Sequence, residues 1–241
     1  MAPRRVTAAG RGEARSVGES GDHASGGRPG AVGSAAMDAE DWNRRYAAAD
    51  LVWSAEPNRF VAAALDGLPP GRALDLASGE GRNALWLAGK GWQVTAIDYA
   101  QVAVDKGRER ARRDGLDVDW TVGDVLAYRP PAEGFDLVLI AYLQLPPDQM
   151  AQVWALASRA VAPGGTLFAI GHDRTNLTHG TGGPQDPDLL WVPEELTRTL
   201  VADGLTVDRA ERVRREVATD EGVRQAVDTL LQAHAPVPDL P

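Results

Sequence analysis

Three acidic residues follow short runs of strand-forming residues, and their order along the chain suits one ligand. Asp75 precedes a glycine-containing turn at 77–81, Asp98 ends a β-rich run, and Asp124 follows Gly123. A carboxylate in a buried strand is costly unless it is paired or hydrogen-bonded, so Asp75 is expected to have a function. A carboxylate at a strand end can accept hydrogen bonds from the two neighbouring hydroxyls of a ribose. The pattern therefore predicts a binding site.

The turn after Asp75 contains Gly79 and Gly81, which have no Cβ atom. The backbone at these positions can bend sharply and approach a ligand closely. In an open α/β sheet, such a turn also presents backbone N–H groups and a helix N-terminus to a ligand beyond the ends of the strands.

A second group of polar residues lies later in the chain. His172 and Asp173 are candidates for catalysis, and Tyr142, Gln144 and His179 are candidates for contact with a substrate. An imidazole has an ordinary pKa of about 6.5, so either histidine is suited to accept a proton near neutral pH. Alternatively, His172 is a hydrogen-bonded residue at a strand end, Tyr142 is a packed ring, and His179 is solvated. We expect no metal site, because the strand before Tyr142 ends without an acid.

Alternating β-rich runs and amphipathic segments predict an α/β fold with a parallel sheet. The expected strands are Arg72–Ala77, Gln93–Asp98, Val118–Val122, Phe135–Tyr142 and Thr166–His172, with extended segments at Leu205–Val217 and Gly222–His234. The expected helices are Arg82–Lys90, Gln101–Asp114, Pro147–Val161 and Pro193–Asp203. A turn is expected at 162–165 and a long flexible loop at 171–187, whereas 223–231 fits a strand or a helix equally well.

Composition excludes several classes of protein. The chain has 241 residues and a formal net charge of −9, which argues for one domain and against nucleic acid, whose binding needs clustered Lys and Arg. The absence of cysteine fits a cytoplasmic protein, and no apolar run reaches the roughly 20 residues that span a membrane. Residues 1–36 lack Trp, Tyr, Phe, Leu and Ile, so we expect a disordered N-terminal tail there and the folded domain at 37–241.

The run from Ala73 to Gly81 resembles motif I of the class I S-adenosylmethionine (SAM)-dependent methyltransferases, and Asp98 and Gly123-Asp124 follow in the order typical of that family. The resemblance implies a Rossmann-like, seven-stranded, mostly parallel sheet with helices on both faces and a C-terminal antiparallel strand. It also implies SAM as the cofactor and S-adenosylhomocysteine as the product. Ala77 departs from the family, which usually has glycine there.

The resemblance assigns roles within the cofactor site. It implies that Asp75 orients the loop and the methionine amine, that Asp98 binds the ribose beside an adenine packed on Tyr99, and that Asp124 meets the adenine amino group. The residues expected at the cofactor are Tyr46, Trp53, Asp75, Ala77, Ser78, Gly79, Gly81, Asn83, Asp98, Tyr99, Gly123, Asp124, Val125 and Ala141.

Two further features narrow the resemblance. The loop sequence Gly-Glu-Gly-Arg-Asn83 and the pattern Trp42-x-x-x-Tyr46 are similar to those of the tellurite-resistance and thiopurine methyltransferases. This similarity implies an N-terminal helical cap over SAM, at 37–70. It also implies in-line methyl transfer to a small-molecule acceptor with a sulfur, selenium or tellurium, oxygen or nitrogen nucleophile, in a monomer or homodimer.

Two alternative functions stay open. Residues 79–84 also fit the Gly-x-Gly-x-x-Gly/Ala fingerprint of an NAD-dependent oxidoreductase, although Asp75, Gly123-Asp124 and the lack of an evident substrate domain argue against that. The other alternative is a protein that binds SAM without catalysis. Methylation of nucleic acid is disfavoured, because 140–145 lacks an Asn/Asp-Pro-Pro-Tyr motif and no cysteine is present for the covalent route.

Overall fold

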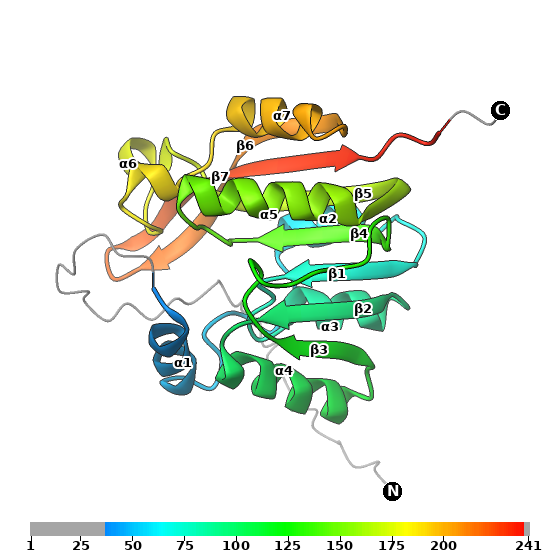
Figure 1. Ribbon diagram of the computed structural model, residues 1–241. Helices are drawn as coiled ribbons and strands as arrows, with labels where there is room; N and C mark the ends of the chain where they lie inside the picture. Colours follow the sequence, from blue (N-terminus) through cyan, green and yellow to red (C-terminus); the bar gives the residue numbers. More distant parts are fainter. Residues whose placement is uncertain (1–36, 239–241) are drawn as a thin grey trace, which may run out of the picture.

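A seven-stranded sheet forms the centre of the protein (Figure 1). The structure is a computed structural model that describes residues 37–238, so the tail predicted at 1–36 lies outside the described residues. The strands are β1 (Arg72–Leu76), β2 (Gln93–Asp98), β3 (Val118–Val122), β4 (Phe135–Ala141), β5 (Val161–His172), β6 (Thr206–Thr219) and β7 (Gly222–His234). Their order is β3-β2-β1-β4-β5-β7-β6, with β1 to β5 parallel and β7 antiparallel to both of its neighbours. This arrangement confirms the predicted fold class.

Helices cover both faces of the sheet. They are α1 (Ala39–Ala47), α2 (Arg59–Leu65), α3 (Arg82–Gly89), α4 (Gln101–Asp114), α5 (Pro147–Ala160), α6 (Asn176–His179) and α7 (Pro193–Ala202), with a 3₁₀ turn η1 (Pro187–Leu189). One core packs Trp154 and Leu200 of α5 and α7 against the face that is nearer in Figure 1, and a second packs Val61 and Leu87 of α2 and α3 against the other face. No described helix is long and apolar enough to cross a membrane.

The observed elements differ from the predicted ones in two places. The predicted turn at 162–165 lies within β5: Phe135 pairs with Val161 and Leu137 with Thr166, so the residues between those pairs bulge out of the ladder. The segment 171–187 contains α6 and is therefore not the continuous flexible loop that was predicted. The ambiguous segment 223–231 is a strand, because β7 pairs with a neighbour on each side.

The strand order brings three loops together at one edge of the sheet. Leu76 pairs with Ile140, and Ala141 pairs with Ile170, so the carboxyl ends of β1, β4 and β5 are neighbours. The chain leaves β1 toward β2 on one side, whereas β4 lies on the other side. Open α/β sheets bind ligands in the crevice at such a switch point. The residues after these three strands are therefore where a site is expected.

Gly81 and Gly115 offer a matched test of packing at the turn after β1. Both have left-handed φ angles, but a Cβ at Gly81 would lie 2.1 Å from Cη2 of Trp120, whereas nothing lies within 4 Å of one at Gly115. We predict that Gly115→Ala lowers the free energy of unfolding by about 1–2 kcal/mol through backbone strain. Gly81→Ala should cost about 1–3 kcal/mol more, because the indole must move. Urea unfolding measures both losses, and equal losses would contradict the packing role.

Candidate active site

The turn after β1 is pinned to the end of β2. Ala77, Gly79 and Gly81 all have positive φ angles, of 58°, 56° and 75°. The Ser78 N–H donates to the carbonyl of Ile97 at 2.9 Å, and the Gly79 N–H donates to Oδ2 of Asp98 at 2.8 Å. A left-handed conformation is uncommon for alanine, so the backbone keeps a glycine-like turn although the sequence has Ala77 there.

Asp75 is buried without a well-formed hydrogen bond to its carboxylate. It is 1% exposed, and neither of its carboxylate oxygens has a well-formed hydrogen bond to any described residue. Burial and the negative charge of Asp98 raise the pKa of Asp75 to about 7, against smaller opposing effects of Arg82 and the Ala84 N–H. The Ser78 hydroxyl, in the turn that follows β1, is also buried and unpartnered. Unsatisfied buried polar groups are costly and rare in folded proteins, so this position calls for a ligand that brings hydrogen-bond donors.

Asp98 is held by backbone N–H groups at the end of β2. Its two oxygens accept from Gly79 at 2.8 Å and from Ala100 at 2.9 Å, and the residue is 5% exposed. Burial raises the pKa of Asp98, and these two N–H groups partly oppose the shift. Each oxygen has a second lone pair, so the carboxylate can still accept from ribose hydroxyls while it organises the start of α4.

The residues predicted at the adenine lie beside the ends of β2 and β3. The Gly123 N–H donates to the carbonyl of Asp98 at 2.9 Å, and Oδ1 of the exposed Asp124 accepts from the Leu126 N–H at 2.9 Å. The hydroxyl of Tyr99 donates to the carbonyl of Met37 at 3.0 Å. Val125 is buried in the core beneath this loop.

The N-terminal cap lies over the glycine turn. Tyr46 is 4% exposed, and its hydroxyl would lie 2.7 Å from a Cβ at Gly79. The indole N–H of Trp53 donates to that hydroxyl at 3.4 Å, and the guanidinium of Arg45 lies 5.3 Å from the Trp53 ring centre. Gly79 therefore lacks a side chain because Tyr46 occupies the space.

Glu80 fixes the cap to the turn, a role that the sequence interpretation missed. It is 2% exposed, and its carboxylate accepts from the N–H groups of Val52 at 3.0 Å and Trp53 at 3.4 Å. Lys106 of α4 lies 3.3 Å from Oε1 of Glu80 and donates to the carbonyl of Tyr46 at 2.6 Å. In the sequence, the one sign of this role was an acid between two glycines. The N–H groups that donate to Glu80 can be identified only from the structure, because they belong to the cap.

Two residues predicted at the cofactor also have packing roles. The amide oxygen of Asn83 accepts from the Asn58 N–H at 2.9 Å, which ties the cap to α3. Gly81 packs against Trp120, where a side chain would clash. The side chain of Asn83 thus binds another part of the protein, and the position that a side chain at Gly81 would take is filled by Trp120.

A second cluster of charged and aromatic residues lies where β4 and β5 end. Tyr142, with a φ of 60°, directly follows β4, and its ring centre lies 5.1 Å from that of His172. The Tyr142 hydroxyl donates to Oδ2 of Asp228 at 2.8 Å, and Nδ1 of His172 lies 3.1 Å from Oδ1 of Asp228. Nε of Arg215 donates to the same Oδ2 at 2.8 Å and to the Tyr142 hydroxyl at 3.0 Å.

Asp228 and Arg215 were not predicted from the sequence, although they complete this cluster. They lie on β7 and β6, and the register of β5 with β7 pairs Asp228 directly with His172. Burial alone would raise the pKa of Asp228, but His172, Arg215 and Tyr142 outweigh it and hold that pKa below its ordinary value. A charged residue in the apolar run 226–231 was the one signal in the sequence.

The remaining predicted residues lie around this cluster. Asp173 is fully buried, and its oxygens accept from Thr175, Arg212 and Thr229 at 2.6–3.1 Å. The structure gives Asp173 a structural rather than a catalytic position, because both oxygens are engaged within the protein. Nε2 of Gln144 donates to the carbonyl of Leu189 at 3.2 Å, and His179 is exposed.

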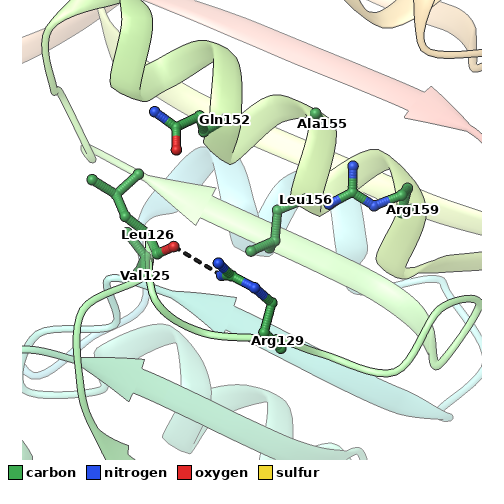
Figure 2. A pocket seen from close by; sticks show the side chains of 7 residues that line it. All are labelled: Val125, Leu126, Arg129, Gln152, Ala155, Leu156 and Arg159. Atoms are coloured by element: carbon green, nitrogen blue, oxygen red, sulfur yellow. Dashed lines mark hydrogen bonds between the residues drawn. The ribbon is translucent and has the colours of Figure 1, made fainter.

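A surface hollow lies apart from both clusters (Figure 2). Figure 2 shows it between α5 and the segment 125–129, with Arg129 and Arg159 among its lining side chains. Arg129 donates to the carbonyl of Leu126 at 2.8 Å. The hollow contains no acid or histidine, and among the described residues no group of three or more such side chains is arranged to hold a metal ion. Its lining therefore offers no proton-transfer chemistry.

Comparison with known proteins points to one class. A family model described as a methyltransferase domain matches residues 73–165. The chain is 36% identical over 118 residues to a ubiquinone biosynthesis O-methyltransferase of Xanthomonas campestris pv. campestris (strain B100), and the match covers 48% of each protein. The chain thus spans about half the length of the curated relatives it matches.

Solved structures share the fold. TehB from Haemophilus influenzae gives a TM-score of 0.64 at 17% identity, over 74% of this chain and 62% of that chain. The N-methyltransferase NodS from Bradyrhizobium japonicum WM9 gives 0.55 at 21% identity, over 74% and 93%. With the strand order, these findings show that residues 73–165 match a methyltransferase domain and that the chain shares the fold of these solved structures.

The residues present fit SAM better than a nicotinamide dinucleotide. SAM carries an ammonium group, which supplies the donors that the buried carboxylate of Asp75 lacks. A nicotinamide dinucleotide has no ammonium group to offer there. The unpartnered acid near the end of β1 therefore favours the methyltransferase cofactor over the dinucleotide alternative.

The raised pKa of Asp75, about 7, leads to a prediction with a defined sign. An acid whose folded pKa lies above its ordinary value destabilises the ligand-free fold as pH rises from about 4 through 7. We therefore predict that Asp75→Asn raises the melting temperature of the ligand-free protein at pH 8.5, and by less at pH 6. The same change should weaken SAM binding at least tenfold, because the ammonium loses its carboxylate partner.

Thermal unfolding and calorimetry measure these two effects. Asp119→Asn, at an exposed acid on neighbouring β3, is the control and should change neither. A variant that is less stable than wild type at pH 8.5, or that binds SAM as tightly as wild type, would contradict the role given to Asp75.

Proposed function

We propose that the protein transfers a methyl group from SAM to a small-molecule acceptor by in-line displacement. The buried, unpartnered carboxylate of Asp75 carries the proposal, because it lies near the end of β1, just before the turn, and requires a cationic donor. The acceptor nucleophile is sulfur, selenium or tellurium, oxygen or nitrogen. The name of the curated O-methyltransferase relatives supports oxygen within that set.

Residues from both sides of the turn would hold the cofactor. Asp75 and Ser78 would bind the methionine ammonium, and Asp98 would bind the ribose hydroxyls. Tyr99 and Asp124 would contact the adenine, and Tyr46 with Trp53 would cover the turn from above. Ala141, the backbone of Val125, and the turn residues Ala77, Gly79, Gly81, Asn83 and Gly123 belong to the same expected set. When bound, SAM supplies a methyl group activated by its sulfonium.

The protein's task in this reaction is mainly positioning. In-line displacement needs the acceptor atom and the methyl group aligned and water kept away. The cap held by Glu80 and Lys106 would exclude water from the cofactor side. His172, at the end of β5 and 5.1 Å from the ring of Tyr142, would take the proton from an acceptor that must lose one.

Calorimetry and a methyl-transfer assay test the proposal. We predict binding of SAM and S-adenosylhomocysteine but not of NAD, and transfer of labelled methyl to at least one member of a panel of thiol, selenium, hydroxyl and amine acceptors. His172→Ala should keep SAM binding and lower transfer to a protonated acceptor about 10²–10⁴-fold. His234→Ala, at a half-exposed histidine that contacts Asp208 and pairs with Thr166 near the other end of β5, is the control and should change neither. Binding of NAD alone would overturn the proposal, and SAM binding without any transfer would favour the non-catalytic alternative.

A further inference from the structure

We propose that the acceptor is a neutral hydroxyl compound, and that the β6–β7 hairpin supplies Asp228 to hold His172 as the base that takes the hydroxyl proton. This inference rests on the proposed methyl transfer. It names the acceptor class within the four nucleophiles given above, and it makes Asp228 a positioning residue.

The contact with Asp228 orients the imidazole of His172. Nδ1 is buried and lies 3.1 Å from Oδ1 of Asp228, whereas the side chain as a whole is 13% exposed. A Cβ at Gly183 would lie 2.8 Å from Cγ and Cδ2 and 3.0 Å from Nδ1 of the ring, so the loop at Gly183 packs against the imidazole. A carboxylate at Nδ1 places the proton on that nitrogen and leaves the lone pair of Nε2 free to accept another.

Asp228 acts through His172 and not on the acceptor itself. It is fully buried, and Tyr142 and Arg215 donate to its Oδ2, both at 2.8 Å. Nδ1 of His172 lies 3.1 Å from Oδ1, within ion-pair distance but without a well-aligned hydrogen bond. These groups keep the carboxylate ionised, since together they hold its pKa below the ordinary value. An ionised, immobile carboxylate fixes the tautomer of the histidine and stabilises the imidazolium that forms.

The cluster around His172 points to a neutral acceptor. The positive charge of Arg215 is balanced by Asp228, and the hydroxyl of Tyr142 stays protonated because burial and Asp228 raise its pKa. Arg82 is the other cation that acts on Tyr142, and it also lies near Asp75 and 5.9 Å from the Trp53 ring centre. A positioned base has a use only for an acceptor that still holds its proton, so the base at this position points to a neutral acceptor.

The reaction balances without any further reactant. The acceptor oxygen forms a bond to the methyl carbon as the carbon–sulfur bond breaks, and the electron pair of that bond stays on sulfur. The hydroxyl proton passes to Nε2 of His172 and is then released to solvent. No atom in the cluster is oxidised or reduced.

Asp228→Asn tests the positioning role, with Asp208→Asn as a matched control. Asp208 contacts His234 at 3.0 Å on the same hairpin but at an exposed pair. We use phenol and catechol as hydroxyl acceptors and thiophenol as an acceptor that ionises at lower pH. For Asp228→Asn we expect kcat with the hydroxyl acceptors to fall at least tenfold, KM for SAM to stay unchanged, and thiophenol to be nearly unaffected. Asp208→Asn should behave as wild type.

The pH profile separates positioning from loss of structure. The loss in Asp228→Asn should shrink as pH rises toward the pKa of the acceptor itself, because an ionised acceptor needs no base. Equal losses at every pH and for every acceptor would overturn the inference, and so would a wild type that methylates thiophenol but neither hydroxyl compound. If Asp228→Asn does not fold, His172→Gln is measured with the same acceptors and is judged by the same outcomes. A wild type that binds SAM and methylates nothing refutes the proposed function instead.

Discussion

The buried carboxylate of Asp75 is the constraint on which the site depends. β1 lies in the middle of the sheet, so its carboxyl end is closed off from water by β2, β4 and the cap. An acid placed there without donors weakens the ligand-free fold, since burial opposes its ionised form. The same arrangement gives a cationic ligand a strong partner in a low-dielectric site. Asp75 therefore lowers the stability of the ligand-free protein and strengthens binding of a cationic ligand, a combination that is common at functional sites.

The two ends of the crevice are built by different parts of the chain. The cofactor end comes from the turn after β1, which Asp98 and Glu80 fix by accepting backbone N–H groups. The acceptor end comes from His172 and Tyr142, which are joined to the C-terminal hairpin through Asp228. The antiparallel β7 places an acid beside the end of a parallel strand. This hairpin thus contributes chemistry as well as an edge to the sheet.

The sequence predicted most of the fold because its signals are local. The bounds of β2, β3, β7 and α4 agree with the predicted ranges, since apolar periodicity and glycine turns mark them within a few residues. Asp75 and Asp98 stood out as acids at the ends of such runs. Asp228 and Glu80 did not, because their partners lie far away in the chain and depend on strand register and cap placement. Asp173 was predicted as catalytic because it follows His172, but only His172 lies in the cluster with Asp228. The carboxylate of Asp173 instead accepts a hydrogen bond from the loop that follows it.

Comparison of two nucleoside ligands tests the central claim most directly. S-adenosylhomocysteine carries the amino-acid ammonium, whereas 5′-methylthioadenosine lacks the amino-acid portion altogether. Calorimetry at pH 8 on the wild type and on Asp75→Asn gives four dissociation constants and hence a coupling between the carboxylate and that portion of the ligand. The account predicts that the wild type prefers S-adenosylhomocysteine and that the variant loses at least tenfold of this preference. An equal preference in both proteins would contradict it.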